Sequence, residues 1–158
     1  REDMVMALFV ATGVGMVMGE HAPLAGADGG CQAECGAAAS MAAAAVVNLM
    51  GGSDEQALHG AAIALKNMLG LVCDPVCGLV EIPCIKRNAI GASTALVSAD
   101  MALAGVQSYI PFDEVVTAMY AIGKQLPAEL RETGRGGLAV TKTGLAMYET
   151  LFGTPMSL

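Results

Sequence analysis

Several residue types that mark other classes of protein are scarce in this 158-residue chain. Tryptophan is absent and aromatic residues make up only 4%, whereas small residues and methionine are prominent. Charged residues make up 15%, and although the net charge is -7, no cluster of basic side chains appears of the kind that binds nucleic acid. We therefore expect no nucleic-acid partner. Small side chains with few rings suit closely packed helices, which favours an all-helical domain.

Long apolar runs are also missing. The apolar stretches at residues 4–18 and 36–49 are each shorter than the roughly 18 to 20 residues that cross a bilayer. We therefore expect buried helices and no membrane partner. Glu2 and Asp3 beside Arg1 argue against the positively charged start of a signal peptide. The chain does not begin with Met, so it reads as a processed product or as part of something longer.

The patterns that are present predict an all-α fold, a compact bundle of about six helices in one domain over residues 1–158. Residues 3–19 are apolar on nearly every face, as in a helix that other helices surround. Proline and several glycines predict a loop at residues 20–30. An Ala-rich segment from about residue 32 to 50 predicts a thin helix that could be central in the bundle.

Start signals predict the remaining helices. Ser53 and Gln56 form a capping box, and Pro111 precedes a first turn that contains acidic residues. The expected helices span residues 54–69, 85–104, 111–126 and 138–152, the last one interrupted or frayed near Gly144, with a short turn at 128–133.

An irregular loop between these helices contains three of the five cysteines and two prolines within residues 70–88. Pro75 and Pro83 lack a backbone donor and favour extended conformations in the residues before them. Cys73 and Cys84 are therefore expected on irregular backbone and not inside a helix. Such backbone can turn several thiolates toward one point.

The cysteines themselves allow several interpretations. Free cysteines are often buried small hydrophobes, and we favour this for Cys35 at the start of the Ala-rich helix. An odd number of cysteines gives poor support to a disulfide framework, and the spacing lacks the close Cys pairs or His partners of a zinc site. Three cysteines on loops would suit an iron-sulfur cluster. The thiols alone do not decide between these possibilities.

Longer motifs resemble a known family. They are GGCQAE (29–34), GLVCDP (70–75), GLVEIPCIKRN (78–88), PFDEVV (111–116) and RETGRGGLA (131–139). In this order they closely resemble the alpha chain of the bacterial iron-sulfur-dependent L-serine dehydratases, over almost the whole sequence. The resemblance implies that Cys31, Cys73 and Cys84 hold a 4Fe-4S cluster. Cys35 and Cys77 stand at positions that do not usually carry ligands.

The same resemblance implies an activity. The family dehydrates and deaminates L-serine to pyruvate and ammonia, in cytoplasmic amino-acid catabolism and gluconeogenesis. Three thiolates leave one iron of the cluster without a protein ligand, and that iron acts as a Lewis acid for the departing hydroxyl group. A base removes the alpha proton, and the cluster keeps its redox state. The complete enzyme is expected to be an oligomer.

Two parts of the family pattern are missing here. One is a beta chain or domain with a Ser-Ser-Ser-His-Thr motif, whose histidine is a candidate for the base. The other is the N-terminal part of the alpha chain. The chain is thus expected to be the C-terminal part of an alpha chain, with L-serine and the beta module as partners, and to be inactive alone. No cysteine follows Cys84 in this sequence, so we expect no counterpart of the C-terminal cysteine that some relatives place into the cluster site.

Further polar residues are candidates for smaller roles. Asn88 and Arg135 are predicted substrate contacts. The alternative for Asn88 is a supporting role behind the cluster ligands, and the alternative for Arg135 is a side chain in a solvated loop. Arg87 shares the helix after Cys84 and could also return toward the cluster. Glu34 could orient the cluster loop or cap a helix, and Asp74 is expected to accept hydrogen bonds at a turn.

Neither histidine is a strong candidate for the base. His59 is expected to be structural, and His21 lies only in the loop that leads to Cys31. Two other functions stay open: a helical structural or interaction module, and a related hydro-lyase or desulfurase acting on another small amino acid.

Overall fold

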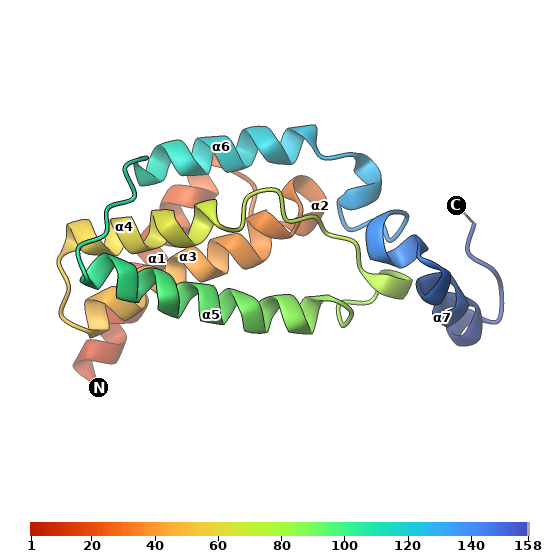
Figure 1. Cartoon of the computed structure of the whole chain (residues 1–158), viewed down its shortest axis with the longest axis horizontal. Helices are drawn as coiled ribbons and strands as arrows, with labels where there is room; N and C mark the ends of the chain where they lie inside the picture. The colour runs from red at the N-terminus through yellow and green to blue at the C-terminus, as the bar shows by residue number, and fades with distance from the viewer. Residues whose placement is uncertain (158) are drawn as a thin grey trace.

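The computed structural model describes residues 1–157 and confirms an all-α fold (Figure 1). Six helices have eleven residues or more, which agrees with the expected number, and α2 has four. The α-helices are α1 (Glu2–His21), α2 (Gly26–Gly29), α3 (Ala37–Leu49), α4 (Asp54–Lys66), α5 (Cys84–Leu103), α6 (Phe112–Gln125) and α7 (Lys142–Phe152). Four shorter helical turns are η1 (Gln32–Gly36), η2 (Val76–Gly78), η3 (Ala128–Leu130) and η4 (Gly137–Val140).

Helix α3 is central, as its alanine content predicts. It packs against α1, α4 and α5, and Figure 1 shows α5 and α6 along opposite sides of α3 and α4. Ala43 and Ala44 are fully buried, and the Ser40 hydroxyl donates a hydrogen bond of 2.9 Å to the Ala61 carbonyl of α4. Small side chains let the neighbouring helices approach closely, so this thin helix fills the middle of the bundle.

The predicted helix starts are confirmed for α4 and α6. The Ser53 hydroxyl accepts from the Gln56 backbone N–H, and the Gln56 side chain accepts from the Ser53 N–H, which completes the capping box. The Gln56 amide also donates to the Ala102 carbonyl at 3.1 Å, which ties the start of α4 to the end of α5. Helix α6 begins directly after Pro111.

The expectation that other helices surround α1 is wrong. Only Ala7, Val14 and Met18 are buried in it, whereas Leu8 and Phe9 are each 67% exposed. The reason is that α1 packs on one side only, against α3 and α6. The apolar run of residues 4–18 is too short to predict a membrane span, but the whole of α1 is long and apolar enough to cross a membrane. A single helix of this kind near the N-terminus is weak evidence for a span.

The loop predicted at residues 20–30 contains the single turn α2. The N–H groups of Gly29 and Gly30 donate to the carbonyls of Ala25 and Gly26, which forms the turn despite the low helix propensity of glycine. A Cβ atom on Gly123 of α6 would lie 3.0 Å from the Gly29 Cα, so the small residues allow α2 to lie directly on α6.

Two further boundaries differ from the prediction. Cys84 is the first residue of α5 and not part of an irregular segment, because the first turn of a helix leaves its N–H groups unpaired and so tolerates the preceding Pro83. Helix α7 starts at Lys142 and not at Leu138, because the Leu138 N–H donates to Asp74 and the Thr141 hydroxyl caps the helix. Cys73 does lie on irregular backbone, as predicted.

Helix α7 lies at the end of the molecule opposite to the N-terminus (Figure 1). It packs chiefly against η2 and η4, not against the other long helices. The loop that contains the prolines therefore stands between the bundle and α7.

Candidate metal centre

One cavity of about 230 Å³ brings together four of the five cysteines. Each of these thiol-bearing residues is at most 8% exposed. The lining residues are Cys31, Glu34, Cys35, Ala38, Cys73, Pro75, Val80, Cys84, Asn88 and Glu132. All three predicted ligands are therefore in this set, although they come from segments that are far apart in the sequence. None of the five cysteines forms a disulfide.

Cys31 is positioned by the residues on either side of it. Gly30 has a φ of +77°, and a Cβ atom there would lie 2.8 Å from the Leu71 carbonyl oxygen, so this close approach requires glycine. Gln32 is fully buried; its backbone N–H donates to the same Leu71 oxygen, and its side-chain oxygen accepts from the Gly70 N–H at 2.9 Å. These contacts fix the Cys31 segment to the segment that leads to Cys73.

Cys73 is held through its backbone by a distant part of the chain. Its N–H donates to the Leu130 carbonyl at 2.8 Å, and its carbonyl accepts from the Glu132 N–H at 2.8 Å. Glu132 has a φ of +67°, which is uncommon for a residue with a side chain. This conformation accompanies the entry of Glu132 into the lining of the cavity.

Cys84 enters the cavity from the first turn of α5, and Arg87 follows one turn later. The Arg87 guanidinium donates to the Asp74 carboxylate at 2.7 Å and to the Val72 carbonyl at 2.9 Å. The other oxygen of Asp74 accepts from the Leu138 N–H at 2.7 Å. Asp74 thus has the hydrogen-bonding role that its place beside a proline predicts, and α5 is joined to the Cys73 segment.

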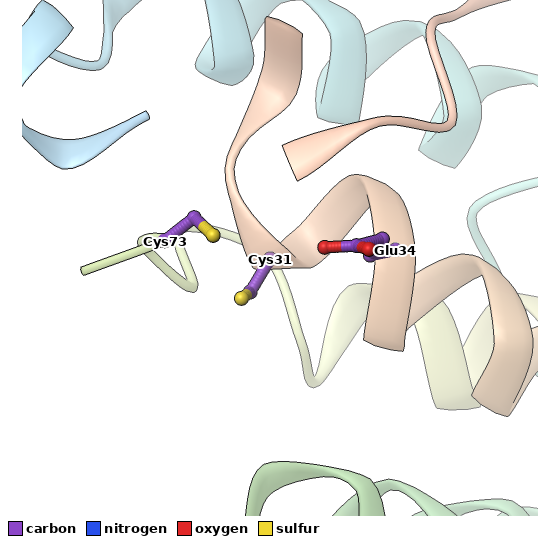
Figure 2. A group of neighbouring side chains, drawn as sticks. All are labelled: Cys31, Glu34 and Cys73. Atoms are coloured by element: carbon purple, nitrogen blue, oxygen red, sulfur yellow. The ribbon is translucent and has the colours of Figure 1, made fainter. Parts of the chain in front are cut away.

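Figure 2 shows Cys31, Glu34 and Cys73 converging from two segments of the chain. One donor atom from each lies within 4.8 Å of the others, a spacing that could hold a metal ion. The backbone of α2 closes this part of the site, because a Cβ atom on Gly26 would lie 2.7 Å from the Glu34 carboxylate and 3.0 Å from the Cys73 Sγ. Soft thiolate donors favour zinc, copper(I) or an iron-sulfur cluster over hard cations.

Burial and mutual proximity raise the pKa values of three thiols in the metal-free site. Burial first, and then the charge on Cys31, raise the pKa of Cys35 to about 11. Burial and Cys31 also raise the pKa of Cys73, and burial raises the pKa of Cys84, which the Arg87 charge opposes. Burial, together with Glu132, raises the pKa of Glu34. A bound metal cation would reverse this balance, because its charge favours thiolate.

The remaining predicted residues divide between the cavity and other places. Asn88 lines the cavity, where its side-chain oxygen accepts from the Cys35 thiol at 3.4 Å. Arg135 and Cys77 line a separate cavity beside α7, so the structure does not bring Arg135 to the cysteines. Its role as a substrate contact stays a prediction.

Neither histidine lines the cysteine cavity. His59 accepts a long hydrogen bond of 3.4 Å from the Ser108 N–H and lies 3.8 Å from Glu55, at the other end of α4. His21 is exposed, and its Nδ1 lies 2.8 Å from the Val17 carbonyl of its own helix. These local contacts agree with the structural role predicted for His59.

Two polar or thiol-bearing lining residues were not predicted from the sequence to face the site. Cys35 is buried as expected, but it also faces the cavity; its position one turn after Cys31 was the available signal. Glu132 gave no such signal, because its place depends on the pairing of residues 130–132 with Cys73. Only the tertiary structure shows that pairing.

Comparisons with known proteins place the chain in a family. The profile of the family described as serine dehydratase alpha chain matches residues 1–139. The chain is 59% identical over 153 residues to the "Probable L-serine dehydratase, alpha chain" of Bacillus subtilis, covering 97% of this chain and 51% of that protein. It is 56% identical over 158 residues to the protein of the same description from Latilactobacillus sakei, covering 100% of this chain and 76% of that one.

More distant relatives include "L-serine dehydratase 1" of Escherichia coli, which is 45% identical over 140 residues and of which the chain covers 31%. The chain thus spans about half the length of the Bacillus relative and less of some others. The profile match nevertheless covers most of the chain and includes every cysteine of the cavity. This chain belongs to the serine dehydratase alpha chain family.

Proposed function

We propose that this chain is the cluster-binding part of an iron-sulfur-dependent L-serine dehydratase, which converts L-serine to pyruvate and ammonia. The observation that carries the proposal is the convergence of Cys31, Cys73 and Cys84 on one cavity in a chain whose relatives are described as L-serine dehydratases. The three cysteines come from the residue before η1, the loop after α4 and the start of α5.

The residues fit a 4Fe-4S cluster. The three thiols are 2%, 3% and 7% exposed, and soft sulfur donors in a shielded cavity are the usual ligands of such clusters. When bound by three thiolates, the cluster would supply an iron without a protein ligand that acts as a Lewis acid toward the substrate hydroxyl group. Cys77, which lines other cavities, is not in the proposed ligand set.

The other lining residues would shape the space for the substrate. Ala38, Pro75 and Val80 give part of the cavity an apolar lining. Asn88 offers an amide that can donate to a carboxylate or accept from an ammonium group of an amino acid. We therefore keep Asn88 as the proposed substrate contact within this chain.

The base is proposed to lie outside this chain. His21 and His59 are engaged elsewhere, and the name alpha chain of the relatives implies a beta chain as a partner. We propose that the beta module supplies the base and that this chain alone is inactive. L-serine would then bind between the cysteine cavity and that module.

Anaerobic cluster reconstitution followed by low-temperature EPR of the reduced protein tests the ligand set. Cys31→Ala, Cys73→Ala and Cys84→Ala should each abolish the cluster signal, whereas Cys77→Ala should retain it. A signal that changes when L-serine is added would support binding of substrate to the cluster. Absence of iron uptake by the wild type, or an equal need for Cys77, would contradict the assignment.

A structural or interaction module remains the second candidate, favoured by the exposed apolar side chains of α1 and α5. Phe9 on α1 is 67% exposed, and Ile85 and Ile90 on α5 are 62% and 63% exposed. Turnover of serine, threonine and cysteine by the cluster-loaded chain with the beta module separates the candidates. Turnover of cysteine alone would favour a desulfurase, and turnover of none would favour the structural module.

A further inference from the structure

Arg87 makes three contacts through a single nitrogen atom. Its Nη1 lies 2.7 Å from the Asp74 carboxylate, 2.9 Å from the Val72 carbonyl oxygen and 4.0 Å from the Cys31 Sγ. One guanidinium nitrogen on α5 therefore reaches both the Cys31 segment and the segment that contains Cys73. The sulfur contact is long, so it acts mainly through charge and only weakly as a hydrogen bond.

The ion pair that holds Arg87 is shielded from water. The side chain of Arg87 is 18% exposed and that of Asp74 is 4% exposed, and Asp74 is itself fixed by the Leu138 N–H. A buried pair with both carboxylate oxygens bonded keeps its geometry, because moving either partner would leave a charge without compensation. The guanidinium is thus held beside Cys31.

The cavity otherwise gathers negative charge. Glu34 and Glu132 lie on its lining, and cysteines that hold a metal group are thiolates. Arg87 lies on α5 just outside this lining, one turn after Cys84 and with its Nη1 4.0 Å from the Cys31 Sγ, while its neighbour Lys86 is exposed to solvent. A fixed cation at this distance lowers the electrostatic cost of placing several thiolates in one cavity.

We propose that Arg87 is a positioning and charge-compensating residue of the cysteine site: anchored by Asp74, it balances the negative charge of the group that Cys31, Cys73 and Cys84 hold. A cation or hydrogen bond near cluster sulfur stabilises the reduced, more negative state and so raises the reduction potential. Because the potential exists only when the cysteines hold a cluster, this role rests on the function proposed above.

The experiment compares the wild type with Arg87→Gln, Arg87→Lys and the control Lys86→Gln. Arg87→Gln and Lys86→Gln remove the same charge from adjacent positions, one beside the thiolates and one in solvent. Lysine at position 87 keeps the charge, and since one nitrogen makes all three contacts, a lysine ammonium with three donors can replace it. Each protein is reconstituted anaerobically; iron and sulfide content, the reduction potential and helical circular dichroism are then measured.

The expected result is a more negative potential in Arg87→Gln, a potential close to that of the wild type in Arg87→Lys, and no change in Lys86→Gln. If Arg87→Gln is folded but takes up no cluster, cluster uptake by Arg87→Lys supports the charge role. If neither variant takes up a cluster, the charge role is overturned and Arg87 has a purely structural role. An unchanged potential in Arg87→Gln also overturns the inference, while the proposed function stands. A wild type without a cluster overturns both.

Discussion

The side-chain amide of Gln32 donates a hydrogen bond of 2.9 Å to the carbonyl oxygen of Met119, 87 residues later in the chain. The oxygen of the same amide accepts from the Gly70 N–H, so one fully buried side chain joins the Cys31 segment to α6 and to the loop before Cys73.

Replacing Gln32 by Leu should destabilise the protein by roughly 1 to 3 kcal/mol, because it removes the two hydrogen bonds that this buried side chain makes to the Gly70 N–H and the Met119 carbonyl. Urea unfolding followed by circular dichroism measures this change. Gln107→Leu is the control, since Gln107 is exposed and should tolerate the same replacement with little effect. Equal unfolding midpoints for the two variants would show that the Gln32 amide is not important for stability.

Replacing Gly30 by Ala should destabilise the protein by more than about 1 kcal/mol. A side chain is strained at a φ of +77°, and the new Cβ would also meet the Leu71 oxygen and the Leu126 side chain. Gly13→Ala provides the matched control: Gly13 is in α1 with no atom within 4 Å of the added Cβ, so alanine should stabilise it by about 0.5 to 1 kcal/mol. Thermal unfolding should show opposite shifts; shifts of one sign would contradict the assigned backbone conformation.

Two methionines of α1 test its one-sided packing. Met18 is fully buried and Met16 is 70% exposed. Met18→Ala should cost about 2 to 5 kcal/mol, because it leaves a cavity in the core, and Met16→Ala should change stability by less than about 0.5 kcal/mol. Denaturant unfolding of both variants measures the difference. Similar losses at the two positions would mean that partners cover both faces of the helix.

The stability of the metal-free protein should decrease at alkaline pH. Burial and the Cys31 charge raise the pKa of Cys35 from 9.0 to about 11, so between these values the unfolded thiol has lost its proton while the folded one retains it. The unfolded state then binds fewer protons, and the free energy of unfolding falls as pH rises through this interval. Unfolding from about pH 8 to about pH 10.5 should show a smaller decline in Cys35→Ser, since serine does not titrate there. Parallel curves for the two proteins would argue against the raised pKa.

Local signals in the sequence predicted much of the fold. The capping box at Ser53, the first turn after Pro111 and the alanines of α3 depend on neighbouring residues, and the structure confirms them. The exposure of α1 could not be predicted, because an apolar composition does not say how many neighbours a helix has.

For the site, the family resemblance singled out Cys31, Cys73 and Cys84, and all three line one cavity in the structure. The supporting contacts were out of reach of sequence reasoning. The pairing of Cys73 with Leu130 and Glu132, and the bond from Leu138 to Asp74, join residues that are more than fifty positions apart and have no common pattern. These contacts arise from packing between segments, which composition and periodicity do not encode.

The attachment of Cys73 to Leu130 and Glu132 also sets an order of events during synthesis on the ribosome. Cys31, Cys73 and Cys84 all emerge well before residue 132, yet the backbone partners that fix Cys73 do not exist until that residue has been added. The cavity therefore reaches its final shape only after residue 132 has left the exit tunnel. Any machinery that delivers iron and sulfide to these thiols would meet the finished cavity only after that point.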